Sequence, residues 1–97
     1  MTAIDIPNNV TSIGERAFYD CFMLANVVIG ANVAEIGYNA FNGCLSLRDI
    51  SIAKTMAQVE AMNYGNWGLG IGRAQYNEYT FEVVIHCTDG NIVVHPG

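Results

Sequence analysis

The chain repeats itself over its first half, and this repeat constrains the fold more than any other feature. Residues 4–26, IDIPNNVTSIGERAFYDCFMLAN, align without a gap to residues 27–49, VVIGANVAEIGYNAFNGCLSLRD. Nine of the 23 aligned positions are identical, and eight of these nine are apolar or glycine. One unit of this length cannot bury its own apolar edge, so the copies are expected to stack on each other. The identical pairs are Ile6/Ile29, Asn9/Asn32, Val10/Val33, Ile13/Ile36, Gly14/Gly37, Ala17/Ala40, Phe18/Phe41, Cys21/Cys44 and Leu24/Leu47.

Each copy begins with the pattern of a short strand. Apolar residues alternate over 4–6 and again over 27–29, which is typical of a strand with one buried face. Val10 and Ile13 then predict a second short extended piece in the first copy. A fixed period of 20–29 residues with regularly placed aliphatic residues favours a leucine-rich-repeat solenoid.

The second half of each copy predicts a bend followed by one or two helical turns. Gly14 and Gly37 stand where a side chain would crowd the neighbouring coil. Segments 15–21 (ERAFYDC) and 38–44 (YNAFNGC) place Ala–Phe and Cys at i, i+1 and i+4, which is one face of a helix. Stacked copies would superimpose the aromatic and thiol side chains, Phe18 on Phe41 and Cys21 on Cys44.

The repeat unit resembles a known family. The pattern I-x-I-P-x-x-V-x-x-I-G-x-x-A-F-x-x-C-x-x-L runs over Ile4–Leu24 and nearly again over Val27–Leu47, and a third copy begins with ISIA at 50–53. Over residues 4–53 the chain closely resembles the BspA-type leucine-rich repeat. The resemblance implies an α/β repeat fold: a short right-handed solenoid of period 23 with parallel strands and helical turns. It also implies adhesion or protein binding at a bacterial surface rather than enzymatic activity.

Residues 54–79 break the period and predict an irregular insertion of helix and loop. A short helix is expected within 54–63, with Thr55 as its N-cap and Met56, Val59 and Met62 on one face. The glycine-rich stretch 65–72 (GNWGLGIG) lacks the lysine and hydroxyl residue of a phosphate loop. We expect it to fold over the last coil through its apolar residues, Trp67, Leu69 and Ile71.

Residues 80–97 predict a β-hairpin that caps the solenoid. The strand patterns TFEVVIHC (80–87) and IVVH (92–95) flank Asp89–Gly90, a strong two-residue turn signal. Such a hairpin would continue the sheet and cover the last coil, as caps do in relatives of the family. We therefore expect one domain over residues 1–97, with repeats at 4–53, the insertion at 54–79 and the cap at 80–97.

The N-terminal side of the first coil has no comparable cap. The chain reaches the first strand almost at once, so the apolar edge of that coil would face water. About three repeats are usually needed for a stable stack, and only two are complete here. Either preceding repeats have been cut away or another chain packs on this coil, and the second alternative predicts a homo-oligomer formed through the uncapped N-terminal coil.

Composition and charge limit the classes of partner and the cellular locations that fit this chain. The net charge is −5 with only four Lys and Arg residues, which disfavours nucleic acid and anionic membrane surfaces. No apolar run is long enough to span a membrane. The first ten residues lack the features of a signal peptide, so a cell-surface or secreted location is expected only if this chain is a fragment of a larger protein. Three cysteines with no C-x-x-C pair favour reduced, buried thiols over disulfides.

Two groups of residues could carry chemistry, and the packing interpretation is favoured for both. Cys21 and Cys44 are expected to form a buried ladder between coils. His86, Cys87, Asp89 and His95 in the hairpin are the candidates for a zinc site or a Cys–His nucleophile pair. His86 is expected to pair near Val93, and Cys87 then points to the opposite face of the strand. This arrangement disfavours both kinds of site. We therefore expect no catalytic residue, no metal ligand and no cofactor.

Function is expected to lie on surfaces that differ between the copies. The solvent-facing strand positions, one per coil, are Asp5, Val28 and Ser51. The aromatic candidates for partner contact or core packing include Tyr19, Trp67, Tyr76 and Tyr79. These features predict a non-catalytic protein-binding or adhesion module whose partner is an unknown protein. The alternative is a structural or oligomerisation element of a larger surface or phage-tail-like assembly. An enzyme is the third and least favoured class.

Overall fold

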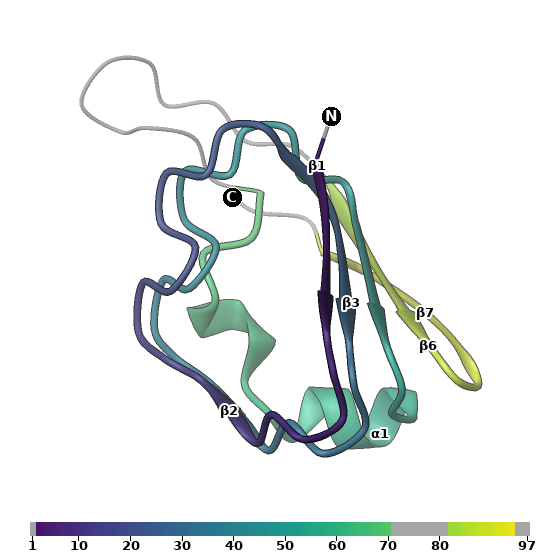
Figure 1. Ribbon diagram of the computed structural model, residues 1–97. Coiled ribbons are helices and arrows are strands. Elements are labelled where there is room, and N and C mark those ends of the chain that lie inside the picture. Colours follow the sequence, from purple (N-terminus) through teal and green to yellow (C-terminus); the bar gives the residue numbers. More distant parts are fainter. Residues whose placement is uncertain (1, 71–81, 95–97) are drawn as a thin grey trace.

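The structure is a computed structural model that describes residues 2–70 and 82–94 (Figure 1). Within these ranges the chain forms seven strands, one α-helix and one 3-10 helix. In chain order they are β1 (Thr2–Ile6), β2 (Ser12–Ile13), β3 (Leu24–Ile29), β4 (Glu35–Ile36), β5 (Asp49–Ile52), α1 (Met56–Glu60), the 3-10 helix η1 (Tyr64–Asn66), β6 (Val83–Cys87) and β7 (Gly90–Val94).

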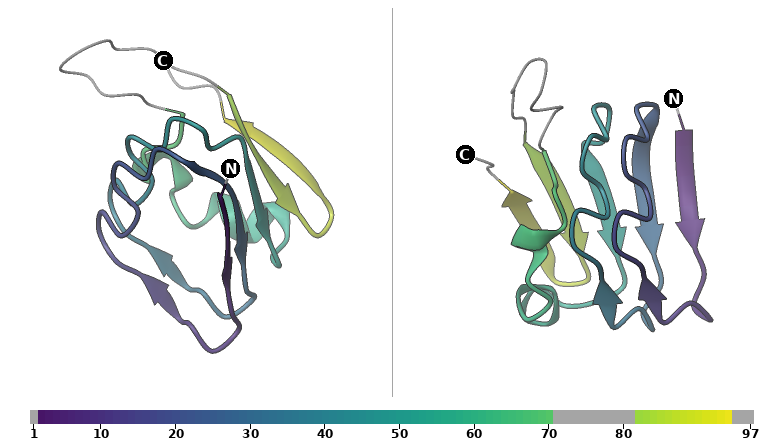
Figure 2. Two further views of the ribbon diagram at one scale, coloured as in Figure 1. Left: turned by 45° about the horizontal axis from the view of Figure 1, so that its top comes forward. Right: turned by 90° about the vertical axis from the view of Figure 1, so that its left-hand side faces the viewer.

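The main sheet has five strands in the order β1-β3-β5-β6-β7. The first four strands are parallel, and β6 and β7 are antiparallel. In the register Ile4 pairs with Val27 and Val27 pairs with Ile50, so equivalent residues of the sequence alignment are strand partners. We call residues 4–26, 27–49 and 50–70 the first, second and third coils, and Figure 2 shows the strands of these coils side by side.

The core lies between the main sheet and the turns on the opposite side of each coil (Figure 1). Alternate strand residues face it, because successive side chains of a strand point to opposite sides of the sheet. One buried or half-buried row crosses all five strands and consists of Ile4, Val27, Ile50, Ile85 and Ile92. The short parallel pair β2–β4 adds the buried Ile13 and Ile36 from another side of each coil.

The segments expected to be helical turns contain no helix. They are chains of β-turns, interrupted by left-handed residues with φ of 57° at Arg16, 61° at Asp20, 57° at Asn39 and 82° at Gly43. Asp, Asn and Gly tolerate this conformation well, whereas arginine does so less often. The expected helical turns are therefore wrong for these segments, although Phe18 and Phe41 do stack, with ring centroids 5.4 Å apart.

Hydrogen bonding between coils explains why a helix does not form. The N–H groups of Arg16, Phe18 and Asp20 in the first coil donate to backbone carbonyls of the second coil. Their acceptors are the carbonyls of Tyr38, Ala40 and Asn42, at 3.1, 2.8 and 2.8 Å respectively. The intervening N–H groups bond within the turns. A helix would direct every N–H along its own axis and leave none for the neighbouring coil.

Helix α1 forms as the sequence predicted. Thr55 is its N-cap, and Gln58 completes a capping box with the Thr55 backbone. Val59 is fully buried, and Met56 and Met62 pack partly against the core. The Met56 N–H donates to Asp89 Oδ1 at 2.8 Å, which ties the helix to the turn of the β6–β7 hairpin.

The third coil ends the core with large side chains. The N–H groups of Asn39 and Phe41 donate to the carbonyls of Asn66 and Trp67, so the backbone ladder continues after α1. Trp67 and Leu69 are buried in the same cluster as Phe41, as expected for a stretch that folds over the last coil. Ile71 lies outside the described residues.

The register of the hairpin differs from the expectation. His86 pairs with Asn91, and Cys87 pairs with Gly90. The two loop residues are therefore Thr88 and Asp89, one position earlier than the Asp89–Gly90 turn that the sequence suggested. The expected pairing of His86 near Val93 is wrong for this reason, because a one-residue change in loop position moves every cross-strand pair.

Close stacking predicts a contrast between two equivalent glycines. A Cβ at Gly37 would meet the Glu15 backbone nitrogen and would lie 2.6 Å from both Glu15 Cα and Gly14 C, all of which are backbone atoms. A Cβ at Gly14 would meet nothing within 4 Å. We expect Gly37→Ala to lower the free energy of unfolding by about 2 kcal/mol through overpacking.

Gly14→Ala is the matched control and should change that free energy by less than about 1 kcal/mol. Urea unfolding at low protein concentration measures both. Equal losses in the two variants would contradict the stacking of the second coil on the first.

Candidate functional site

The outward side of the main sheet brings side chains from every coil into register. We call this surface the sheet face. One row across the strands consists of Asp5, Val28, Ser51, His86 and Asn91. The neighbouring row consists of Ala3, Asn26, Asp49, Val84 and Val93. Both rows follow from the register alone, because alternate residues of paired strands share a side.

The sheet face combines apolar and polar groups. Val28 and Val93 are 45% and 43% exposed, which leaves two aliphatic side chains open to solvent. Between them, His86 Nε2 lies 2.9 Å from Asp49 Oδ1, and the two side chains are 41% and 47% exposed. An exposed pair of this kind contributes little to stability. These side chains are therefore available for contacts with a partner.

A shallow depression lies at one end of this face. It is lined by Val28, Ser51, His86 and Thr88, together with the strand-end residues Ile29, Ile52, Ala53 and Cys87. Ser51 pairs directly with His86 across β5 and β6. The described contacts include no hydrogen bond between Ser51 and His86, so the three residues Ser51, His86 and Asp49 do not have the geometry of a catalytic triad.

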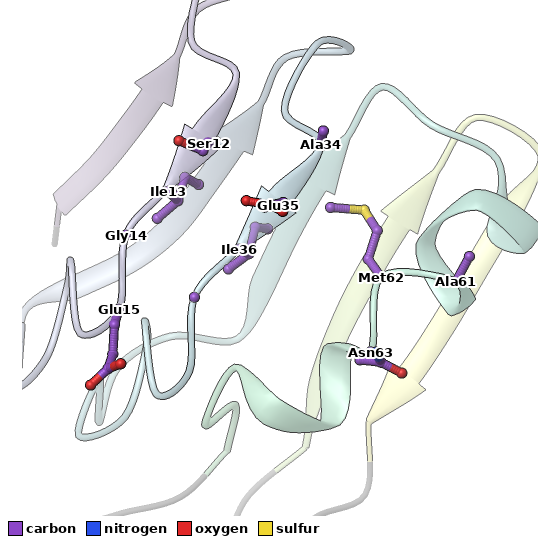
Figure 3. Close-up of a pocket in the computed structure, with 11 residues that line it drawn as sticks. Ser12, Ile13, Gly14, Glu15, Ala34, Glu35, Ile36, Ala61, Met62 and Asn63 are labelled. Carbon is purple, nitrogen blue, oxygen red and sulfur yellow. The ribbon is translucent and has the colours of Figure 1, made fainter.

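A second depression lies between β4 and the segment after α1 (Figure 3). Met62 reaches into it from the far side, and Glu15 and Glu35 lie on the side of β2 and β4. The two carboxylates do not point toward one another. Over residues 2–70 and 82–94 there is no group of three His, Cys, Asp or Glu side chains that could hold a metal ion.

The structure places the predicted site residues in different environments. Asp5, Val28 and Ser51 share one row of the sheet face, as the period implies. Tyr19 is exposed on a turn, with the Arg16 guanidinium 5.7 Å from its ring centroid. Trp67 is completely buried, so it cannot contact a partner and its inclusion as a surface anchor was wrong. Tyr76 and Tyr79 lie outside the described residues.

Asn26, Asp49 and His86 belong to the sheet face but were not among the surface residues predicted from the sequence. Asn26 and Asp49 are 23 residues apart and pair with each other in the equivalent strands β3 and β5, so the period could have identified them. The period could not place His86, because β6 pairs with β5 only after the irregular insertion. Its 35-residue offset from Ser51 depends on the path of that insertion.

The residues considered for a zinc or Cys–His site do not converge. His86 faces outward toward Asp49, whereas Cys87 packs partly against the core. The Asp89 carboxylate accepts from the Met56 N–H at the start of α1. His95 lies outside the described residues.

The thiols are poorly suited to nucleophilic chemistry. Burial raises the pKa of the Cys44 thiol from 9.0 to about 12, and its Sγ donates to the Phe18 carbonyl at 3.1 Å. Burial, with Asp89 and Glu60 nearby, also raises the pKa of Cys87. A thiolate is the reactive form, so both side chains are held in the unreactive state.

This environment predicts slow alkylation of Cys44 in the folded protein. Iodoacetamide should modify Cys44 far more slowly than the half-buried Cys21. Labelling of Cys44 should stay slow as the pH rises through 9, because its pKa is about 12 when folded. Cleavage after glutamate places Cys21 on peptide 16–35 and Cys44 on peptide 36–60. Mass spectrometry of these two peptides gives both rates, and unfolding in urea should make them equal. Equal rates in the native protein would contradict the buried inter-coil position of Cys44.

None of the helices in the described ranges has the length and apolar content of a membrane-spanning segment. The strand register, the inter-coil ladder and the buried Phe and Cys positions together describe stacked repeats of one sequence unit.

Comparison with known proteins agrees with this description. A family model described as BspA type leucine-rich repeat region (6 copies) matches residues 1–67. The match reaches further than the 4–53 inferred from the sequence pattern and includes α1, η1 and Trp67. No curated protein and no solved structure matches the chain. Repeats of this family are typically surface-associated, generally non-catalytic and commonly mediate protein–protein interaction. The chain belongs to the BspA-type leucine-rich repeat family.

Proposed function

We propose that this chain is a non-catalytic protein-binding module that contacts its partner through the sheet face. The observation that carries the proposal is the pair of registered rows, which align side chains from three coils and the hairpin on one surface. A partner that lies across the strands would contact every coil at once. Specificity would then come from the residues that differ between the copies.

The composition of the sheet face supports this role. Val28 and Val93 offer apolar contact area, and Asn26, Ser51 and Asn91 offer hydrogen bonds around them. Protein interfaces combine such apolar area with a polar surround. The broad, shallow shape of the depression suits a protein or peptide better than an enclosed small molecule.

The wider setting is part of the same proposal. We infer that the coils form one right-handed solenoid of period 23, ended by the β6–β7 hairpin, with residues 1–97 as one domain. Parallel crossover connections are right-handed in nearly all proteins. We further infer a role in adhesion at a bacterial cell surface.

Selection of binders from a displayed peptide library tests the site. Peptides selected on the 97-residue chain should bind Val28→Lys at least about tenfold more weakly, a loss of about 1.4 kcal/mol. Tyr38→Lys is the matched control, because Tyr38 is also an exposed apolar residue and lies at the start of the turn segment after β4. Both variants should stay folded, since neither side chain is buried.

Amide chemical-shift changes on peptide binding provide the second measurement. They should cluster on β3, β5 and β6, around Val28, Ser51 and His86. Peptides that bind Val28→Lys normally and lose binding to Tyr38→Lys would place the binding surface on the turns and contradict the proposal.

A second candidate is an oligomerisation element of a larger surface or phage-tail-like assembly. The observation that favours it is the position of β1 at the open edge of the main sheet. A symmetric oligomer joined through the first coil whose sheet face selects no peptides would support this candidate, and peptide binding through the sheet face, in a monomer or an oligomer, would support the first.

A further inference from the structure

The outer side of the first coil carries core-type residues that nothing in the described structure covers. In the second coil, Val33, Ala40, Phe41 and Cys44 are between 0% and 2% exposed. Their identical counterparts in the first coil are Val10, Phe18 and Cys21, which are only half-buried, and Ala17, which is exposed. The side chains are the same in both coils, so the difference comes from the presence or absence of a neighbouring coil.

Large side chains close one end of the core, whereas the other end is left with a hollow. Trp67 and Leu69 close the end at the third coil. At the first coil a hollow remains, and its apolar lining consists of Ile6, Pro7, Val10, Ile13, Ala17 and Phe18. We call this hollow and its lining the coil-1 face.

Strand β1 adds unpaired backbone groups beside the coil-1 face. The Ile6 carbonyl accepts from the Gly30 N–H, so Ile6 directs its backbone groups toward β3. Backbone direction alternates along a parallel strand, so Ala3 and Asp5 direct their N–H and carbonyl groups to the open side. β1 has β3 as its one strand neighbour among the described residues.

We infer that the coil-1 face binds a second copy of this chain about a two-fold axis, with the two β1 strands antiparallel. A two-fold axis through Ile4 places Ala3 opposite Asp5 of the second copy, and each such pair exchanges two backbone hydrogen bonds. Ile4 then lies opposite Ile4 of the second copy, on the core side. The arrangement uses the same donors and acceptors in both chains, and it sets each Asp5 carboxylate opposite an alanine rather than opposite the other Asp5.

The size of the coil-1 face is sufficient for such a pair. The molecule measures 36 × 23 × 22 Å. An end face of these proportions has an area on the order of 500 Å², so two faces bury about 1,000 Å², the lower limit of a specific interface. We therefore expect a dimer whose population rises with protein concentration. This inference does not depend on the sheet face.

Sedimentation or light scattering of the full chain tests the dimer. The mass should rise toward twice the 10.5 kDa monomer mass as the concentration increases. Ala3→Pro removes an N–H on the open side of β1, and Ala17→Glu places a carboxylate in the hollow. Each variant should weaken association by about tenfold or more. Ala57→Glu is the matched control: it makes the same change at an exposed alanine of α1 and should leave the dimer unchanged.

Two results would overturn the inference. One is a monomer at the highest soluble concentration, and the other is a dimer that persists in both Ala3→Pro and Ala17→Glu. If Ala3→Pro fails to fold, Ala17→Glu decides, because its side chain is exposed and the monomer fold does not need it. Val28→Lys should dimerise normally, and Ala17→Glu should still bind the selected peptides, so failure of either proposal can be recognised separately.

Discussion

The backbone hydrogen bonds between successive coils are the interaction on which the rest of the structure depends. The Gly30 N–H reaches the Ile6 carbonyl at 2.9 Å, and on the opposite side of the coil Phe18 donates to Ala40. For both to form, neighbouring coils must follow the same path at strand spacing all the way round. This requirement explains the left-handed residues in the turns. It also explains Gly37, where a Cβ would collide with the backbone of the first coil.

The same stacking creates the surface through which we propose the protein works. Each coil contributes its outward strand residues at the same position along the strand. Asp5, Val28 and Ser51 therefore form a row across the sheet although successive members of the row are 23 residues apart in the sequence. The core residues of the repeat must stay alike to maintain the stacking, whereas the outward residues are free to differ. The same 23-residue unit therefore supplies both the residues of a stable scaffold and those of the variable surface that we propose binds a partner.

The sequence predicted the elements that depend on periodicity and local capping. The pairing of Ile4 with Val27 follows from the alignment, and α1 follows from Thr55 and the spacing of Met56 and Val59. The turn conformation was missed because Ala–Phe and Cys occur at a spacing that also suits a helix, and only the neighbouring coil selects β-turns. The hairpin register and the meeting of His86 with Asp49 were missed for a related reason: both depend on how the chain returns to the sheet after residues 54–79. Trp67 was predicted both as core and as a surface anchor, and its position against the second coil decides for the core.

The most direct test of the inter-coil ladder is the measurement of scalar couplings across hydrogen bonds by NMR. The stacked coils predict couplings from the Phe18 amide nitrogen to the Ala40 carbonyl carbon, and from the Phe41 amide nitrogen to the Trp67 carbonyl carbon. Helical turns would instead couple Phe18 to the Gly14 carbonyl and Phe41 to the Gly37 carbonyl. Observation of the second pattern, or of neither, would contradict the stacked-coil structure.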